Sequence, residues 1–320
     1  MKVIITGKTS YIGTHLCEFF ELKGYSVKMV SLRDGLDKVD FSGYDVVVHC
    51  SAIVHKDERE YKNDYEKINH KLAVDTAKKA RDEKVSQFIF LSSMSVYGTG
   101  CPKITKETEP KPNSLYGKTK LEAEKEILEL NSDLFTVTVI RPPMVYGKGC
   151  IGNYMKLRDF IKKHKVFPKV NNKKSFINIK NLSFFIYSII ERQKSGIFMP
   201  MDEEYVSTTH LAENIAKAHN KKLRLSKFMG ILICLVNAVG LNKTVKKAFG
   251  SLYYDESCAT KVGYVSFEKG IKETESTKST KKTTPWGTTS GCCRLSIKST
   301  ALQKINDFLQ IKLYSKIFIR

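Results

Sequence analysis

The sequence predicts an α/β protein built on a doubly wound parallel β-sheet. Short apolar strand patterns alternate with amphipathic helix patterns through the first half of the 320 residues, as expected where helices cover both faces of such a sheet. The first strand pattern ends in a turn that contains Gly7, and the alternation becomes irregular after Gly149. The length is sufficient for one large domain or two interlocked ones with a full core.

The elements of the first half follow the order that a doubly wound sheet requires. Strands are expected where apolar and β-branched residues form short runs, and helices where apolar residues recur every three or four positions. Ligands of these sheets bind at the carboxyl ends of the strands. The strand patterns cover 2–6, 26–31, 45–50, 86–92 and 135–141, and the helix patterns cover about 12–23, 65–83 and 115–131.

The second half predicts a smaller C-terminal substrate domain. Helices are expected near 152–164, 180–192 and 208–219, and the apolar stretch 228–240 predicts a buried or partner-facing helix, with contact to a membrane surface as the minor alternative. From Ser276 the composition shifts to Ser, Thr, Lys and Gly, which is typical of a disordered or loosely attached tail. The expected division is 1–148, 149–275 and a basic tail at 276–320, and interleaving of the first two parts is left open.

The net charge of +21 raises the alternative of nucleic-acid binding, because clustered basic side chains release counterions from a phosphate backbone. Lysine outnumbers arginine 45 to 9, however, which indicates general lysine usage more than base recognition. Residues 277–320 alone carry nine basic side chains and one acidic one, and the basic charge of the rest is diffuse. We expect no specific nucleic-acid partner.

The cysteines and the apolar segments bear on the compartment. Eight cysteines form no Cys-x-x-Cys pair and no cysteine–histidine spacing typical of zinc sites, which predicts a reducing compartment and no metal site. The N-terminus lacks the apolar core of a signal peptide, and the most apolar stretch is too short to span a bilayer. A cytoplasmic protein without a transmembrane segment is expected.

The stretch TGKTSYIG at 6–13 has the character of a phosphate-binding turn. Gly7 and Gly13 match a dinucleotide-binding turn, where small residues allow a tight bend and let a pyrophosphate approach the helix N-terminus. Ser10 occupies the middle glycine position and narrows that approach. A P-loop is excluded, because the glycine it needs five positions earlier is Lys2. Glycine also commonly ends strands in α/β proteins that bind no nucleotide, so the turn alone does not establish nucleotide binding.

Tyr116 and Lys120 are the candidate catalytic pair. They lie four residues apart at the start of a predicted helix, so both side chains project from one face. A nearby ammonium favours the phenolate, and a positively charged nicotinamide favours it further, which makes a base. Such pairs also occur on solvated helix faces. Ser93 supplies the context, because it lies near the end of the fourth strand with a hydroxyl for the same substrate oxygen; Ser92 and Ser95 are the alternatives.

Five stretches follow one another in a specific order: TGKTSYIG, DVVVHCSA, SSMSVYG, YGKTK and RPPMVYG. With them, residues 1–275 resemble the extended short-chain dehydrogenases/reductases of the NAD-dependent sugar-nucleotide epimerase/dehydratase family. The similarity is greatest to the short epimerase-like members of bacterial capsule and O-antigen clusters. It implies a Rossmann-type NAD(P)-binding domain at 1–148 and a homodimer that pairs through the helices at 65–83 and 115–131.

The resemblance also implies roles for individual residues. Tyr116 corresponds to the catalytic base, Lys120 to its ribose-binding and pKa-lowering partner, and Ser93 to the hydroxyl that assists at the substrate. The other implied cofactor contacts are Gly7, Ser10, Tyr11, Ile12 and Gly13 at the pyrophosphate, Ser51 and Ala52 beside the adenosine, Asn69 near the active site, and Pro142 and Pro143 beside the nicotinamide.

The sequence departs from the family pattern at informative positions. Dehydratases carry adjacent acidic residues before Val-Tyr-Gly, where this chain has Met94 and Ser95, so a 4,6-dehydratase is not expected. Arg33 lies near the position of the acidic residue that binds the ribose of NAD, and is either a partner for the 2′-phosphate of NADP or a surface arginine. The family resemblance implies NAD as the cofactor, and Arg33 keeps NADP as the alternative. Lys174 stands where an arginine often meets the substrate diphosphate and is the implied substrate contact.

The leading hypothesis is a UDP-hexose or UDP-N-acetylhexosamine 4-epimerase of polysaccharide biosynthesis. Tyr116 takes the proton of the sugar 4-hydroxyl as hydride leaves carbon 4, and the 4-keto sugar regains hydride on its other face. One alternative is an NADPH-dependent 4-keto-sugar-nucleotide reductase, which Arg33 favours. Another is a non-catalytic dinucleotide-binding module, which Ser10 and the altered substrate-domain residues favour.

Overall fold

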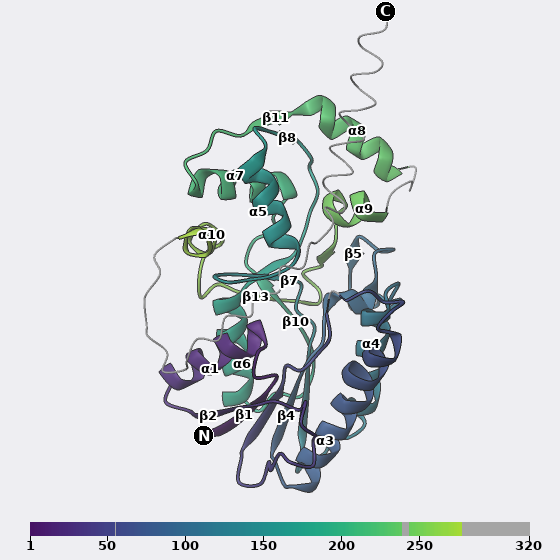
Figure 1. Cartoon of the computed structure of the whole chain (residues 1–320), viewed down its shortest axis with the longest axis vertical. Helices are drawn as coiled ribbons and strands as arrows, with labels where there is room; N and C mark the ends of the chain where they lie inside the picture. Colours follow the sequence, from purple (N-terminus) through teal and green to yellow (C-terminus); the bar gives the residue numbers. More distant parts are fainter. Residues whose placement is uncertain (55, 239–242, 277–320) are drawn as a thin grey trace, which may run out of the picture.

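The computed structural model describes residues 1–54, 56–238 and 243–276, which form the coloured ribbon in Figure 1. The tail expected at 276–320 lies outside the described residues from 277 onward, and so do the last two positions of the apolar stretch 228–240.

A seven-stranded parallel sheet lies at the centre of the fold, as the sequence predicts (Figure 1). The strand order is β13-β10-β6-β4-β3-β1-β2, and every adjacent pair is parallel. The strands are β1 (Lys2–Thr6), β2 (Ser26–Val30), β3 (Val46–His49), β4 (Gln87–Leu91), β6 (Thr136–Ile140), β10 (Gly196–Asp202) and β13 (Ala259–Val262).

The sheet is buried on both faces, because successive side chains of a strand point to opposite sides. In β1, Val3 and Ile5 belong to the core on one face, and Ile4 belongs to the core on the other. In β4, Ile89 and Phe90 divide in the same way. Runs of consecutive apolar residues are therefore the sequence signal of these strands.

Helices cover each face of the sheet. Helices α1 (Tyr11–Leu22) and α6 (Ile179–Glu191) pack together on one face, and α3 (Leu72–Asp82) and α4 (Leu115–Leu128) pack on the other (Figure 1). A short helix, α2 (Lys62–Asp64), and a π-helical segment, η1 (Tyr65–Lys71), lead into α3, and η1 also packs against α4. The predicted helices at 12–23, 65–83 and 115–131 are thus confirmed within a few residues.

The chain reverses direction across the sheet between β2 and β3. From β1 it passes through α1 to β2 on one side, and then returns to β3 on the other side of β1. Residues 31–45 between them form no strand or helix, although Leu32, Val39 and Phe41 are buried against the α3 face. The topological switch point therefore lies at the carboxyl ends of β1 and β3, where ligands of doubly wound sheets bind.

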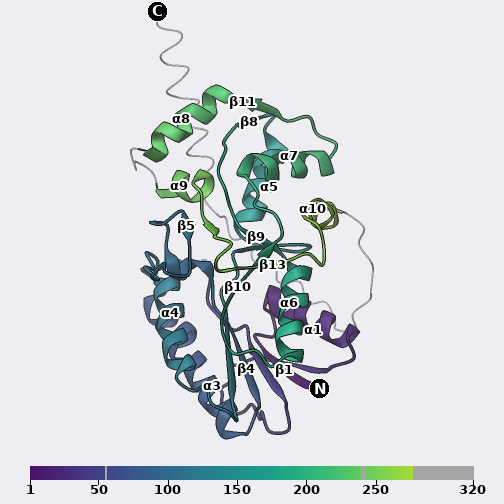
Figure 2. The ribbon, with the colours of Figure 1, turned by 180° about the vertical axis from the view of Figure 1, so that it is seen from behind.

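A smaller lobe lies beyond the carboxyl ends of the strands (Figures 1 and 2). The chain enters it after β6, returns to the sheet for α6 and β10, and returns again for β13, so segment 149–275 adds β10 and β13 at one border of the sheet. The lobe contains α5 (Asn153–Lys163), α7 (Thr208–Ala218), α8 (Lys227–Ala238), α9 (Lys243–Phe249) and α10 (Phe267–Glu275), with the parallel strand pairs β7 (Met144–Tyr146) and β9 (Phe176–Asn178), β8 (Val166–Pro168) and β11 (Arg224–Ser226), and β5 (Lys103–Ile104) and β12 (Tyr253–Tyr254).

The helices predicted in the second half are present, and α8 shows what the apolar stretch 228–240 does. Ile233 of α8 is buried in the core of the lobe, whereas Phe228, Ile231 and Leu235 are exposed. The helix thus has one packed side and one apolar side that faces outward. None of the helices in the described part of the chain has the length and apolar character needed to cross a membrane.

A buried ion pair joins α4 to the end of β6. The Arg141 guanidinium donates to both carboxylate oxygens of Glu124, with Nε 3.1 Å from each, and also donates to the Tyr97 hydroxyl at 2.7 Å. Tyr254 donates its hydroxyl to the Arg141 carbonyl at 2.7 Å. Both charged side chains are almost fully buried, so each depends on the other to compensate for the loss of solvation.

Removing one member of this pair should destabilise the protein strongly. In Glu124→Ala the Arg141 charge stays buried without a counter-charge, so the free energy of unfolding is expected to fall by about 3–5 kcal/mol. Urea unfolding measures the change. The exposed neighbour Glu122 provides the control, since Glu122→Ala should stay within about 0.5 kcal/mol of the wild type. If Glu124→Ala and Glu122→Ala lost similar amounts of unfolding free energy, the special contribution of the Glu124–Arg141 ion pair would be contradicted.

Candidate functional site

The turn between β1 and α1 has the geometry of a dinucleotide-binding turn. Gly7 has a φ angle of +87°, which glycine adopts without strain. A Cβ atom at Gly7 would lie 3.1 Å from the Cys50 carbonyl carbon and 3.1 Å from the Ser51 nitrogen, and one at Gly13 would lie 3.3 Å from Met29 Cε. The first glycine allows β1 and β3 to end side by side, and the second allows α1 to lie close to the sheet.

Ser10 is the N-cap of α1, at the position of the middle glycine. Its Oγ accepts a hydrogen bond from the Gly13 N–H at 3.2 Å. The first intrahelical bond runs from the Thr14 N–H to the Ser10 carbonyl, so the N–H groups of Tyr11 and Ile12 have no acceptor within the helix. These two amides, at the positive end of the helix dipole, suit an anionic pyrophosphate.

The loop after β3 is fixed by side-chain amide and hydroxyl bonds. Ser51 Oγ donates to Thr6 Oγ1 at 3.1 Å and so links the ends of β3 and β1. Asn69 accepts from the Ile53 N–H at 2.7 Å and donates to the Ile53 carbonyl at 3.0 Å. Asn69 therefore positions the loop that contains Ala52, and its direct contact with a cofactor stays a prediction.

Ser93 interacts with the Tyr116 phenol in the sense that lowers the pKa of Tyr116. Ser93 Oγ also accepts from the Ser95 backbone N–H at 3.1 Å and from the Ser95 hydroxyl at 2.8 Å. Because Ser95 occupies the acceptor sites of Ser93, the Ser93 hydroxyl hydrogen is available to the Tyr116 oxygen. The Ser92 hydroxyl, in contrast, is buried without a hydrogen-bond partner among the described residues.

Lys120 lies one helical turn after Tyr116 and is 1% exposed. Its Nζ donates to the Leu91 carbonyl at 2.8 Å and lies 4.4 Å from the centre of the Phe90 ring. Both contacts belong to β4, the strand that leads to Ser93. The structure thus brings Ser93, Tyr116 and Lys120 together at the carboxyl end of β4, next to the strand ends that flank the glycine turn.

The protein side chains alone do not lower the pKa of Tyr116. Burial raises that pKa to about 12, and the hydrogen bond from Ser93 opposes the increase. The Lys120 ammonium is held against the Leu91 carbonyl, and burial lowers its own pKa to about 8; its effect on the Tyr116 phenol stays a prediction. Ser93 is therefore the neighbour that favours the phenolate, since it donates to the charged form.

Gly117 allows the first turn of α4 to approach the loop after β4. A Cβ atom at Gly117 would lie 2.5 Å from the Ser95 carbonyl oxygen and 3.0 Å from Pro112 Cβ. The close contact places Tyr116 within reach of Ser93. Gly117 is not among the predicted site residues, although a glycine inside a helix pattern, where alanine is more stable by about 0.5–1 kcal/mol, is a detectable signal.

Three further residues are predicted cofactor contacts: Pro142, Pro143 and Tyr11. Pro142 and Pro143 follow β6 and are buried, and the Pro142 carbonyl accepts from the Met94 N–H at 2.9 Å. The Tyr11 side chain extends back from the turn, where its hydroxyl is buried without a partner among the described residues. A Cβ atom at Gly147 would lie 2.8 Å from that hydroxyl.

Arg33 lies in the loop after β2, beside the glycine turn. The N–H groups of Gly7 and Lys8 both donate to the Val30 carbonyl at 3.0 Å, which ties the turn to the end of β2. Arg33 is exposed, and its side chain forms no ion pair within the described part of the chain. Its location suits a group at the adenosine end of a dinucleotide.

Lys174 lies in a different environment. Its Nζ donates to the Lys247 carbonyl at 2.8 Å, and its backbone bridges to Val206 and Leu252. Burial lowers the pKa of Lys174 to about 8. None of these contacts joins Lys174 to Tyr116 or the glycine turn, so its role at the substrate stays a prediction.

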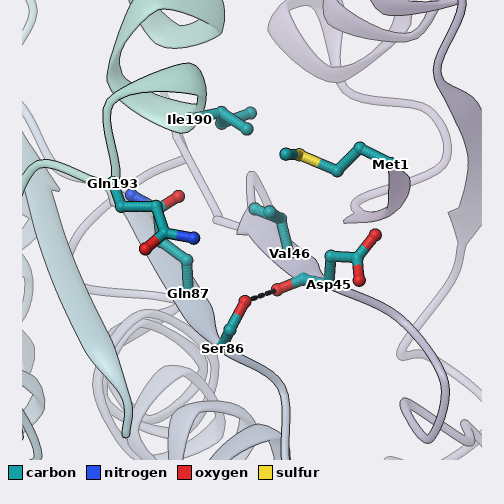
Figure 3. Close-up of a pocket in the computed structure, with 7 residues that line it drawn as sticks. All are labelled: Met1, Asp45, Val46, Ser86, Gln87, Ile190 and Gln193. Atoms are coloured by element: carbon teal, nitrogen blue, oxygen red, sulfur yellow. Dashed lines mark hydrogen bonds between the residues drawn. The ribbon is translucent and has the colours of Figure 1, made fainter. Parts of the chain in front are cut away.

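The pocket in Figure 3 lies at the amino ends of the strands, opposite the strand ends that lead to Ser93. Its lining residues Met1, Asp45 and Ser86 precede β1, β3 and β4, and Ser86 Oγ donates to the Asp45 carbonyl at 2.7 Å. These are the amino ends of the strands, whereas ligands of doubly wound sheets bind at the carboxyl ends. We assign this pocket no role in the site.

One group of described side chains has the spacing of metal ligands: Glu66, His70 and Glu122. Both ring nitrogens of His70 are already engaged, one with Glu66 at 2.7 Å and the other with Glu126. The group lies on η1 and α4 at the surface, and exposed carboxylates of this kind are common without an ion. It does not belong to the site around Tyr116.

Gly117→Ala tests the close approach of α4. Alanine in a helix should stabilise the protein by about 0.5–1 kcal/mol on backbone grounds alone, but here the new methyl group meets the Ser95 carbonyl. We expect a net loss of about 1–3 kcal/mol in the free energy of unfolding, measured by urea unfolding. Lys118→Ala, at an exposed neighbouring position, should change little. A Gly117→Ala variant more stable than the wild type would rule out the tight contact.

Lys120→Met tests the buried ammonium through its pH dependence. The folded pKa is about 8 and the ordinary value is 10.5, so between these values the unfolded chain binds more protons and stability should rise with pH. The destabilising contribution is fully present below about pH 8 and disappears above about pH 10.5. Thermal unfolding across this range should show a smaller increase in Lys120→Met than in the wild type and the exposed-site control Lys118→Met, because Lys174, whose pKa is also about 8, still contributes in the variant. If the wild type, Lys118→Met and Lys120→Met had identical pH profiles, the buried Lys120 ammonium would not be the source of this pH dependence.

Comparison with known proteins places these features in a family. The sequence profile of the NAD dependent epimerase/dehydratase family matches residues 3–196. A UDP-glucose 4-epimerase of Vibrio cholerae is 31% identical over 251 residues, which cover 69% of this chain and 76% of that protein.

Two solved structures have a similar fold. The UDP-glucuronic acid 4-epimerase of Bacillus cereus in complex with NAD has a TM-score of 0.65 at 18% identity and covers 86% of this chain and 97% of its own. The dTDP-4-dehydrorhamnose reductase of Bacillus anthracis in complex with NADP has a TM-score of 0.58 at 20% identity and covers 70% and 82%. The glycine turn, the order of the strands and the match of the family profile together show that the chain belongs to the NAD-dependent epimerase/dehydratase family.

Proposed function

We propose that this protein is a nucleotide-sugar 4-epimerase acting on a UDP-hexose or UDP-N-acetylhexosamine. The observation that carries the proposal is the grouping of Ser93, Tyr116 and Lys120 at the carboxyl end of β4, with Lys120 one helical turn after Tyr116. A phenol paired with a hydroxyl donor suits reversible proton exchange with a sugar hydroxyl. The Vibrio cholerae relative, named a UDP-glucose 4-epimerase, supports the choice of a UDP-linked sugar.

The residues at the switch point fit a dinucleotide cofactor. Gly7 and the N–H groups of Tyr11 and Ile12 would hold the pyrophosphate, and Ser51 would lie beside the adenosine half. Lys120 donates one of its three N–H groups to Leu91, which leaves two for ribose hydroxyls. Bound NAD would supply the hydride acceptor for sugar carbon 4 and a positive charge that favours the phenolate.

Tyr116 exchanges the proton with the substrate. As carbon 4 is oxidised, the O–H bond of the 4-hydroxyl breaks and its proton passes to the Tyr116 oxygen, which leaves a 4-keto sugar. When carbon 4 is reduced on its other face, Tyr116 returns that proton to the ketone oxygen. Ser93 donates to the same oxygens in both directions. General acid–base catalysis of this kind contributes about 10²- to 10⁴-fold to the rate.

A 4-keto-sugar-nucleotide reductase that consumes NADPH is the second candidate. Arg33, exposed beside the glycine turn and free of ion pairs in the described structure, favours it, because a 2′-phosphate would meet a guanidinium there. A non-catalytic module is disfavoured by the assembled Ser93, Tyr116 and Lys120. A 4,6-dehydratase is disfavoured because Met94 and Ser95 replace its acidic residues.

Three broader expectations accompany the proposal. We propose a homodimer that pairs through η1, α3 and α4, a cytoplasmic location, and a role in polysaccharide biosynthesis. The division into a cofactor-binding part at 1–148 and a substrate-binding part at 149–275, with Lys174 at the substrate diphosphate, is proposed in the same sense. Their support is the resemblance to short epimerases.

The purified protein should interconvert a UDP-sugar and its 4-epimer without added cofactor. A panel of UDP-hexoses and UDP-N-acetylhexosamines, incubated with and without NADPH and followed by product identification, tests this expectation. Epimer formation with no NADPH consumed supports the proposal. Reduction with one NADPH oxidised per product would replace it with the second candidate, and inertness toward the whole panel would contradict both.

Tyr116→Phe then locates the chemistry. The substitution removes only the phenolic oxygen, so turnover is expected to fall by about 10²-fold or more. The free energy of unfolding should stay within about 1 kcal/mol of the wild-type value. Tyr44→Phe is the matched control, because Tyr44 precedes β3 at the opposite edge of the sheet. An active Tyr116→Phe enzyme would eliminate this mechanism.

A further inference from the structure

Helix α8 exposes three large apolar side chains on one side. Phe228, Ile231 and Leu235 are 58%, 60% and 57% exposed, and their spacing of three and four residues places them on one face of the helix. The other side is anchored, because Ile233 is buried in the core of the lobe and Gly230 lies directly against the Lys169 carbonyl. The outward apolar face is thus held in place on a packed helix.

The surroundings of this face are basic. Between Glu213 and Asp255 the sequence contains no acidic residue and eight basic ones: Lys217, Lys221, Lys222, Arg224, Lys227, Lys243, Lys246 and Lys247. The β8–β11 pair leads directly into α8 and adds basic side chains from β8 and its flanks. Lys165, Lys169, Lys222, Arg224 and Lys227 are all exposed, and within the described residues none of them forms an ion pair.

We propose that this face docks on an anionic lipid membrane. We call it the α8 surface and define it by two sets: exposed apolar Phe228, Ile231 and Leu235, and exposed basic Lys165, Lys169, Lys222, Arg224 and Lys227. An amphipathic helix with basic flanks lies in the plane of a bilayer, with its apolar side among the acyl chains and its cations near anionic headgroups. The twelve residues of α8 are too few to span the bilayer.

Charge decides between the membrane and other occupants. A second copy of the chain would bring the same unpaired cations against these, which costs free energy in an interface. A nucleic acid would match the cations but would leave the three apolar side chains without a partner. An anionic bilayer satisfies both sets at once, because it offers negative headgroups above an apolar interior.

The position of α8 allows this contact without covering the catalytic residues. Both views place α8 at the end of the molecule opposite the strands β1 to β4 (Figures 1 and 2). Tyr116 and Lys120 lie on α4, against the sheet. A protein attached through α8 would therefore keep its Rossmann sheet on the side of the molecule that faces away from the membrane.

Sedimentation of the full chain with lipid vesicles tests the proposal. Vesicles of phosphatidylcholine alone are compared with vesicles that also contain phosphatidylglycerol. The wild type should bind the anionic vesicles at least about tenfold more tightly, because each basic side chain near the surface contributes about 1 kcal/mol, and high salt should weaken this binding. Absence of binding to both kinds of vesicle would overturn the proposal.

Two variants assign the binding to the α8 surface. Ile231→Ser/Leu235→Ser removes apolar contact, and Lys222→Glu/Lys227→Glu reverses two charges; each should reduce binding about tenfold or more. The matched controls are Leu22→Ser/Leu134→Ser and Lys38→Glu/Lys194→Glu, which alter exposed residues elsewhere and should bind nearly as the wild type does. Thermal unfolding confirms that all four remain folded.

The variant comparison also separates other sources of binding. Residues 277–320 are basic as well, but they are identical in all the proteins compared. If both α8 variants bind as tightly as the wild type, or if the controls lose as much as the α8 variants, the α8 surface is not the membrane contact. If Ile231→Ser/Leu235→Ser changes the oligomeric state and no protein binds vesicles, the face is an interface between copies and the proposal fails.

Discussion

The seating of α4 on the sheet is the constraint on which the site depends. Tyr116, Lys120 and Glu124 follow one another at intervals of four residues, so one face of the helix carries all three. Each is fixed by a different part of the sheet: Ser93 after β4, the Leu91 carbonyl within β4, and Arg141 after β6. Gly117 sets how closely the first turn lies to the loop. The position of the Tyr116 phenol therefore depends on the register of α4 along the sheet and on the distance between α4 and the loop after β4.

The three contacts differ in their cost. Glu124 and Arg141 compensate each other's burial, so they act as a structural clamp. Lys120 donates to a neutral carbonyl and lies against an aromatic ring, and burial lowers the pKa of its ammonium, so the charge of Lys120 is held at a cost in stability. Groups held at such a cost are characteristic of functional sites. The Glu124–Arg141 pair thus holds α4 in the register that keeps the Lys120 ammonium against β4.

Local patterns were sufficient to predict the sheet, its helices and the group of Ser93, Tyr116 and Lys120, because strand runs, helix periodicity and strand-end positions are encoded in neighbouring residues. What depends on distant partners could not be predicted. The bond from Lys120 to the Leu91 carbonyl joins two separate elements. The pairing of Glu124 with Arg141 required the register of α4 on β6. For α8, periodicity indicated an apolar helix but not which side the lobe would cover.

The lack of a strand in residues 31–45 has a consequence for colloidal behaviour. It leaves β2 as the outermost strand, with one row of backbone amides and carbonyls unpaired by any strand in the described chain. Unprotected borders of this kind recruit strands from other molecules and initiate precipitation. Here the border is only five residues long and has Lys28 at its centre, with its Nζ 6.0 Å from the Tyr44 ring. The Lys28 charge thus opposes edge-to-edge association at the β2 border of the sheet at high protein concentration.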